Sequence, residues 1–155
     1  MSLRVVPVTA DRWEDMCMLF EQPGPRGGAR NVPAYGCRCM YWRDRSLEHG
    51  EPKKEAMAKL VRAGRKPGLL AYDGDEPVGS VSVGPREDFA SLRRSPQYGP
   101  RESGGGDAVW SLVCFVVDKP RRGTGVAAAL LDSRSSMRSP TARARSRPIR
   151  TKQSA

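Results

Sequence analysis

A short glycine-rich loop with two adjacent arginines carries the clearest chemical signal in this chain. Within Val109–Asp132, an apolar segment leads into the loop KPRRGTG and then into a run of helix-forming residues. Gly123 and Gly125 would leave successive backbone N–H groups uncovered, and a helix start adds further unpaired N–H groups and the positive end of its dipole. Such an arrangement binds phosphate oxygens, and Arg121 and Arg122 can add charge-assisted hydrogen bonds. The loop therefore predicts a pyrophosphate-binding site.

Other interpretations fit this loop less well. Gly123–Ala128 also matches G-x-G-x-x-A, but that dinucleotide motif follows the first strand of a βαβ unit and precedes an acid by about 20 residues. Here the motif lies late in the chain, and no acidic residue follows Asp132. A P-loop would need G-K-[S/T] at its end, which is absent from the sequence. A glycine-capped loop that binds nothing is the structural alternative, and the paired arginines argue against it.

Four stretches of the chain are predicted to form strands. Leu3–Val8 alternates and is rich in β-branched residues. Gly68–Tyr72 and Pro77–Val83 predict a hairpin, since the D-G pair between them suits a turn with positive φ. Val109–Val117 is the most apolar run in the chain. Its β-branched and aromatic residues predict a central strand, buried on both faces, that leads into the glycine loop.

Three stretches predict helices. The first follows a capping residue, Thr9 or Asp11, and buries a helically spaced apolar stripe. This stripe consists of Trp13, Met16, Cys17, Leu19 and Phe20. Glu51–Ala63 predicts a second helix, which Gly64 ends. A third begins near Gly125, at the end of the arginine–glycine loop.

Most of the positive charge lies at one end of the chain. The formal net charge is +10, which invites a nucleic-acid-binding function. Residues 133–155, however, hold seven basic and no acidic side chains, which leaves +3 for the first 132 residues. This tail also has no aromatic residue for base stacking. The body is therefore near neutral, and nucleic acid is not the predicted partner.

Neither a membrane segment nor a metal site is predicted. The chain has no apolar run of the ~18 residues that a spanning helix needs, and no secretory signal, so we expect a cytoplasmic protein with reduced thiols. Cys37, Cys39 and His49 could be considered as zinc ligands. However, C-x-C is not the usual C-x2-C spacing, and a fourth ligand would have to come from Cys17 or Cys114. We interpret these last two as small core residues.

Taken in order, these features resemble the GNAT superfamily of N-acetyltransferases. The acetyl-CoA motif of that family is R/Q-x-x-G-x-G/A, between its fourth strand and the next helix, and Arg122–Ala127 fits it. The stretch GLLAYDGDEPVGSVSVGPRED is similar to the family's second and third strands, with a V-G pair after the turn. CRCMYWR, the early R-G-G and VWSLVCFVV resemble one bacterial branch. The resemblance covers roughly residues 3–132 and implies an α/β (α+β) fold, with a mixed, mostly antiparallel sheet flanked by helices.

The resemblance implies an enzyme that transfers an acetyl group from acetyl-CoA to a primary amine. The backbone of the fourth strand would hold the pantetheine arm, and the loop would hold the pyrophosphate. The residues implied are Phe115, Val116, Val117, Arg121, Arg122, Gly123, Thr124, Gly125, Val126 and Ala127. The amine would attack the thioester directly after a base or a water chain removes its proton. A backbone donor from the same strand would stabilise the oxyanion.

The sequence assigns no catalytic base. The fourth strand lacks the glutamate that some relatives carry, and Asp118, Glu102 and Tyr41 are candidates that each also fit a solvated surface group. In many relatives a tyrosine near the C-terminus protonates the thiolate, and no residue here corresponds to it. The acceptor would be selected by the loops Gln22–Gly36 and Pro85–Gly106, in which we recognise no pattern.

The family pattern stops after Asp132. Residues 133–155 are rich in Ser, Arg, Pro and Thr, with Met137 and Ile149 as the only large apolar residues. A reverse translation with freely chosen codons, shifted by two nucleotides, can read AVEYAQSHGARALEAYPNKAER, which resembles the helix, turn and strand of the family at this point. We therefore interpret residues 1–132 as a truncated GNAT-like domain, and residues 133–155 as a basic, unpacked tail produced by a one-nucleotide deletion.

A missing fifth strand would leave an apolar edge on the fourth strand. We therefore expect low stability, weak or no activity, and a homodimer that covers this edge. Two alternative functions are a non-catalytic acyl-CoA-binding remnant, which would bind the donor without turnover, and a nucleic-acid-binding protein that uses the arginine-rich tail. The second alternative predicts a steep salt dependence that disappears when residues 133–155 are deleted.

Overall fold

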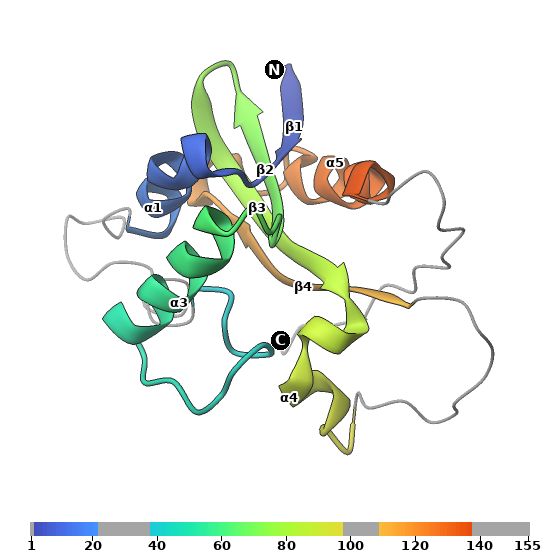
Figure 1. Ribbon diagram of the computed structural model, residues 1–155. Coiled ribbons are helices and arrows are strands. Elements are labelled where there is room, and N and C mark those ends of the chain that lie inside the picture. Colours follow the sequence, from blue (N-terminus) through green and yellow to red (C-terminus); the bar gives the residue numbers. More distant parts are fainter. Residues whose placement is uncertain (1, 22–37, 98–108, 138–155) are drawn as a thin grey trace.

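Four antiparallel strands form the sheet on which the rest of the chain is arranged. The computed structural model describes residues 2–21, 38–97 and 109–137. The strands are β1 (Leu3–Pro7), β2 (Gly68–Asp73), β3 (Glu76–Pro85) and β4 (Trp110–Val117). They lie in the order β1-β2-β3-β4, and each neighbouring pair is antiparallel (Figure 1). The four predicted strands and the hairpin turn at Gly74 are therefore confirmed, with slightly different boundaries.

Helices cover both faces of this sheet. α1 (Trp13–Glu21) and α3 (Glu51–Arg62) lie on one face, and α5 (Val126–Asp132) lies on the other (Figure 1). A short helix, α4 (Ala90–Arg93), follows β3, and a 3-10 stretch, Ser133–Met137, continues α5. No helix in the described part of the chain is both long and apolar enough to cross a bilayer. The three predicted helices are present, and the predicted α/β class is confirmed.

The alternation of β2 divides the core into two layers. Leu70 and Tyr72 pack on the side of α1 and α3, whereas Leu69 and Ala71 pack on the side of α5. Four residues of the predicted α1 stripe are buried: Met16, Cys17, Leu19 and Phe20. Burial of a large apolar side chain contributes roughly 1.5–3 kcal/mol, so this stripe accounts for the attachment of α1 to the sheet.

The helical segment begins at Thr9 rather than at Asp11. Thr9 is the N-cap of a 3-10 turn, Ala10–Arg12, that leads directly into α1. Its hydroxyl accepts a hydrogen bond from Arg12 Nη1 at 2.8 Å and donates to the Asp11 carboxylate. The predicted cap is thus at the expected place, but its side chain bonds side chains and not a backbone N–H.

The prediction that β4 is a central strand is wrong among the described strands, because β4 forms one edge of the sheet. Its first half is buried on both faces, with Leu112 in the core layer under α5 and Val113 against Phe89. Its second half is more open, and the Phe115 side chain is 43% exposed. Apolar composition indicates burial in general, but the position of a strand within a sheet depends on its neighbours.

A buried arginine, Arg38, is bonded to α1 and, through Glu21, is linked to α3. Arg38 is 2% exposed and adopts a positive φ of 49°. Its Nη2 donates to Glu21 Oε1 at the end of α1 at 2.7 Å, and Lys54 Nζ in α3 donates to the same oxygen at 2.6 Å. The bonds from Lys54 and Arg38 lower the pKa of the Glu21 carboxyl from 4.5 to about 2.

This cluster predicts an acid-dependent loss of stability. Because the pKa of Glu21 is lower in the folded chain, its contribution is complete above pH 4.5 and disappears as the pH falls towards about 2. We expect this contribution to be on the order of 1–2 kcal/mol, since solvent partly screens the group. Urea unfolding at a series of pH values should therefore show a flatter acid limb in Glu21→Gln than in the wild type.

Glu55→Gln is the matched control for this prediction. Glu55 pairs with Arg62 at 3.2 Å on an exposed helix surface, so its removal should leave the acid limb unchanged. An acid limb in Glu21→Gln as steep as that of the wild type would contradict the assignment.

Candidate functional site

The arginine–glycine loop connects the end of β4 to the start of α5. It begins with a 3-10 turn, Lys119–Arg121, and contains two glycines with positive φ, Gly123 at 75° and Gly125 at 92°. Gly125 is the N-cap of α5. A Cβ at either glycine would meet no atom of the described residues within 4 Å. The glycines are thus required by the backbone conformation and not by close packing, and the space around them is open.

Two internal turns close the first part of this loop. The Arg122 N–H donates to the Lys119 carbonyl at 3.2 Å, and the Thr124 N–H donates to the Arg121 carbonyl at 3.3 Å. The Thr124 hydroxyl donates to the same Arg121 carbonyl. The amides of Arg122 and Thr124 therefore maintain the shape of the loop.

The start of α5 supplies the open donors. The first backbone hydrogen bond of the helix runs from the Ala129 N–H to the Gly125 carbonyl at 3.0 Å. The N–H groups of Val126 and Ala127 precede it, so they have no acceptor within the helix. They lie at the positive end of the helix, next to the open space at Gly125. This is the part of the loop that is suited to an anion.

The two arginines of the loop have different surroundings. Arg121 pairs with Asp73, and its Nη2 donates to Glu76 Oε2 at 3.0 Å. Its hydrogen bond to Asp73 raises the pKa of Arg121. Arg122 is exposed, and its Nε lies 3.4 Å from the Val117 carbonyl. Arg121 thus fastens the loop to the β2–β3 hairpin, whereas the charge of Arg122 faces solvent.

Close packing between β3 and α5 fixes the position of the loop. A Cβ on Gly79 would lie 2.5 Å from Val126 Cγ1 and 3.1 Å from the Val116 carbonyl oxygen. Only glycine therefore allows α5 to approach the sheet this closely. The Asp118 N–H also donates to the Val78 carbonyl at 2.9 Å, which joins the start of the loop to β3. The V-G pair after the hairpin turn thus has a packing role in placing the helix.

A bulge interrupts β4 just before its last residues. Ser82 pairs with Val113 and Ser80 pairs with Val116, so Cys114 and Phe115 together face a single residue, Val81. Cys114 has a φ of 56°, a conformation that costs a non-glycine residue roughly 1–2 kcal/mol. No local sequence pattern indicates this bulge, because the residue with positive φ is not glycine.

The bulge re-aims the backbone at the edge of the sheet. The Cys114 carbonyl meets the Sγ of Cys39 at 3.9 Å, and Phe115 is exposed. After the bulge, Val116 and Val117 resume pairing with β3. The structure therefore places the ten predicted site residues along one continuous path, from the bulge through the end of β4 to the start of α5.

Of the three candidate bases, Asp118 and Tyr41 are described, and neither acquires a distinctive environment. Asp118 is half-buried at the start of the loop, and Glu102 lies outside the described residues. The Tyr41 ring packs edge-on against Trp42, with the Arg45 guanidinium 4.8 Å from its centroid. The structure therefore does not identify a base among them.

Three cysteines lie among the described residues, and they occupy different surroundings. Cys17 is buried in α1, and burial raises the pKa of its thiol, which keeps it protonated and unreactive. Cys39 is buried against β4, Cys114 is half-buried at the bulge, and Cys37 lies outside the described residues. In the described ranges, no three potential metal ligands gather at one place.

Comparison with known proteins gives a family match over most of the chain. A protein-family model described as "Acetyltransferase (GNAT) family" matches residues 34–133. This range includes α3, the β2–β3 hairpin, β4, the arginine–glycine loop and α5. No curated protein matches the chain.

Solved structures of acetyltransferases have a similar fold at low sequence identity. An aminoglycoside antibiotic 6'-N-acetyltransferase from Acinetobacter baumannii matches with a TM-score of 0.57 and 16% identity, over 98% of this chain and 82% of that one. A GCN5-related N-acetyltransferase from Ralstonia eutropha JMP134 matches with a TM-score of 0.54 and 16% identity, over 97% and 85%. A possible acetyltransferase from Clostridium difficile 630 matches with a TM-score of 0.54 and 10% identity, over 99% and 82%.

Proposed function

The chain belongs to the GNAT acetyltransferase family, and from this premise we propose that it transfers an acetyl group from acetyl-CoA to a primary amine. Membership supports acyl transfer in general, and the donor and the acceptor are our proposal. The observation that carries it is the open start of α5, where the N–H groups of Val126 and Ala127 lie next to two glycines with positive φ. A pyrophosphate is the anion that such a group of donors suits.

In this proposal the loop and the edge of β4 bind different parts of the donor. The amides of Gly125, Val126 and Ala127 hold the pyrophosphate, and the exposed guanidinium of Arg122 adds a charge-assisted bond. The backbone of Phe115–Val117 holds the pantetheine arm. The ion pairs of Arg121 with the hairpin hold the loop in place for this binding.

The chemistry is a direct transfer. The amine nitrogen attacks the thioester carbonyl, a C–N bond forms and the C–S bond breaks. The coenzyme leaves as a thiolate that takes up a proton, while the amine loses one to a base or to a chain of water molecules. A backbone N–H at the edge of β4 stabilises the oxyanion that forms during the attack. The bulge at Cys114 supports this assignment, since it changes the direction of the backbone groups at that edge.

Isothermal titration with acetyl-CoA tests the donor site, and release of free thiol in the presence of a panel of primary amines tests the transfer. The same measurements are made on a chain in which residues 133–155 are replaced by AVEYAQSHGARALEAYPNKAER. Binding and thiol release by either chain would support the proposal, and binding by the replaced chain alone would support the proposed frame change. Binding without thiol release would favour a non-catalytic acyl-CoA-binding protein. No binding by either chain would overturn the donor assignment.

Among the described strands β4 has one unpaired edge, which further supports a homodimer in which this edge is covered. Phe115 is 43% exposed on this strand, and unpaired apolar edges tend to pair with other chains. We expect the wild type to elute as a dimer in size-exclusion chromatography with light scattering, and Phe115→Lys to elute as a monomer. Met18→Lys is the control, because Met18 is an even more exposed apolar residue (55%) that lies on α1.

Acetyl-CoA provides a second test of the same edge. If the pantetheine arm occupies Phe115–Val117, saturating acetyl-CoA should compete with the partner strand and shift the dimer towards monomer. A wild type that is monomeric at all concentrations would contradict the proposed dimer.

A further inference from the structure

A cavity of about 660 Å³ lies at the other end of the sheet from the arginine–glycine loop. Pro67, Pro85 and Trp110 border it, and they mark the start of β2, the end of β3 and the start of β4. The loop instead follows the opposite end of β4. The volume lies within the range of roughly 300–1,000 Å³ that is typical of small-molecule sites. The cavity is therefore separate from the proposed donor site.

A rigidly held arginine forms one side of this cavity. The Arg43 side chain is 7% exposed, and its Nη2 donates to the Pro67 carbonyl at 3.0 Å and to Ser82 Oγ at 3.3 Å. The guanidinium lies 4.4 Å from the centroid of the Phe89 ring. Its Nε is buried and has no hydrogen-bond partner among the described residues. The orientation of this cation is thus fixed, while part of its hydrogen-bonding capacity is unused.

The carboxylate that pairs with Arg43 lies too far away for a direct hydrogen bond. Asp88 is its ion-pair partner, but Asp88 Oδ2 lies 3.8 Å from Arg43 Nη1, longer than the roughly 2.7–2.9 Å of a charge-assisted hydrogen bond. Arg65 lines the same cavity. Burial lowers the pKa of Arg43, and the charge of Arg65 lowers it further. Asp88, Cys39 and Cys114 act in the opposite direction.

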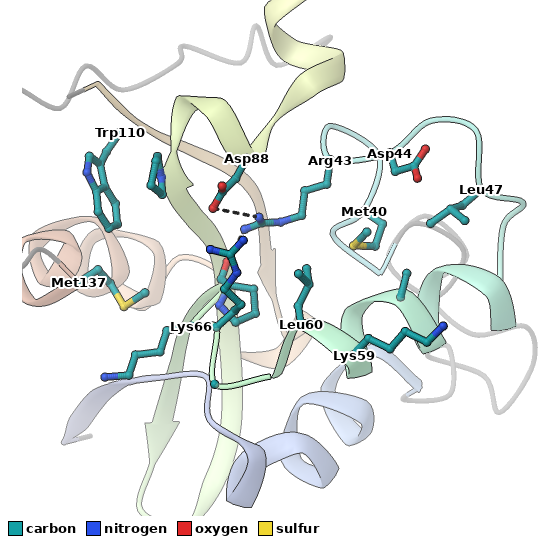
Figure 2. Close-up of a pocket in the computed structure, with 15 residues that line it drawn as sticks. Met40, Arg43, Asp44, Leu47, Lys59, Leu60, Lys66, Asp88, Trp110 and Met137 are labelled. Carbon is teal, nitrogen blue, oxygen red and sulfur yellow. Dashed lines mark hydrogen bonds and ion pairs between the residues drawn. The ribbon is translucent and has the colours of Figure 1, made fainter. Parts of the chain in front are cut away.

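The other charged groups of the cavity lie towards its rim. Figure 2 shows the side chains of Asp44, Lys59 and Lys66 directed away from the Arg43 guanidinium. The remaining charged side chains of the lining are Arg43, Arg65 and Asp88, an excess of one positive charge. A single carboxylate would neutralise this excess and give Arg43 and Arg65 a shared acceptor.

Apolar side chains complete the remaining walls. Met40, Leu47, Leu60, Trp110 and Met137 line the cavity and come from four separate parts of the chain (Figure 2). A ligand that fits must therefore carry an apolar body next to its charged group, because inorganic anions would leave these walls unused.

We propose that this cavity binds a small amphipathic monocarboxylate, with the carboxylate between Arg43 and Arg65 and the apolar body against Leu60 and Trp110. The proposal does not depend on acetyl transfer. The cavity contributes a second binding site to the chain, at the end of β4 that lies away from the arginine–glycine loop.

Titration with 4-phenylbutyrate tests the proposal on the full chain. We expect saturable binding by calorimetry and a rise in melting temperature. The neutral 4-phenylbutanamide, the cationic 4-phenylbutylamine and inorganic phosphate should each bind at least about tenfold more weakly. Equal binding of the amide, or tighter binding of phosphate, would overturn the proposed ligand class, and no binding of 4-phenylbutyrate would overturn the site.

Variants identify the residues that bind the carboxylate. Arg65→Gln changes an exposed side chain and should weaken the binding of 4-phenylbutyrate by about tenfold without loss of folding. Arg43→Lys keeps the positive charge and should weaken this binding by a similar factor. The melting curve of Arg43→Lys reports whether the variant still folds. Arg62→Gln is the control, since Arg62 pairs with Glu55 outside the cavity. Unchanged binding in Arg65→Gln would contradict the proposal, whereas Gly125→Glu, which alters only the donor loop, should bind 4-phenylbutyrate normally.

Discussion

The affinity for acetyl-CoA should fall by at least about 100-fold when Gly125 is replaced by glutamate. The backbone of Gly125 has a φ of 92° at the N-cap of α5, and an L residue there costs roughly 1–2 kcal/mol. The new carboxylate would also lie among the open N–H groups that we assign to the pyrophosphate, where it repels the anion and occupies its donors. Calorimetric titration with acetyl-CoA measures the effect directly.

Gly50→Glu is a close control for this substitution. Gly50 also has a φ of 92°, is also a helix N-cap, at α3, and a Cβ there would also meet no atom within 4 Å. Its ψ of −127° lies further from the conformations that L residues adopt, so the control is strained at least as much. We expect Gly50→Glu to bind acetyl-CoA with nearly the wild-type affinity. A similar loss in both variants would mean that strain, and not the anion site, explains the effect.

Replacement of Gly79 by alanine should lower the free energy of unfolding by about 1–3 kcal/mol. The added Cβ would lie 2.5 Å from a methyl group of Val126 and 3.1 Å from the Val116 carbonyl oxygen. Val126 is buried and β-branched, so its methyl group has little room to move, and the closer contact is relieved mainly by a shift of α5. This helix carries the N–H groups of the proposed donor site. Urea unfolding measures the stability, and acetyl-CoA titration measures the accompanying loss of affinity.

A double-mutant cycle with Val126→Ala separates overpacking from a general loss of stability. Removal of the Val126 methyl groups leaves room for the new Cβ, so the double variant should lose less stability than the sum of the two single variants. Gly84→Ala in the same strand is the control. Its Cβ would come no closer than 3.3 Å, and to a side-chain oxygen of Asp88, so its effect should be smaller. Additive losses in the cycle would contradict the packing role of Gly79.

Local patterns in the sequence were sufficient for the four strands and for α1, α3 and α5, whereas α4 lies in a stretch predicted as a loop. The D-G pair predicted the turn between β2 and β3, the apolar stripe predicted α1, and the glycine loop predicted the start of α5. Each depends on interactions between residues a few positions apart, such as turn geometry, helical periodicity and the conformational freedom of glycine. The family resemblance likewise depends on the order of such local motifs along the chain.

The position of β4 shows where local patterns stop being informative. Its composition predicted a central strand, yet it forms an edge among the described strands and leaves Phe115 exposed. The bulge at Cys114 was equally unpredictable, because a cysteine with positive φ is maintained by the pairing with β3 on either side. Both features depend on residues that lie about 30 positions away in the sequence.

The sequence by itself thus determined α1, α3 and α5, the hairpin and the arginine–glycine loop, because turn chemistry and periodicity act over a few residues. Only the tertiary structure decided how the charges are used. Arg121 and Arg122 are neighbours, but Arg121 pairs with Asp73 and Glu76 across the hairpin, whereas Arg122 stays exposed. Arg43 gained its role from burial beside Asp88. Such partners are far apart in the chain, and packing of the strands and helices brings them together.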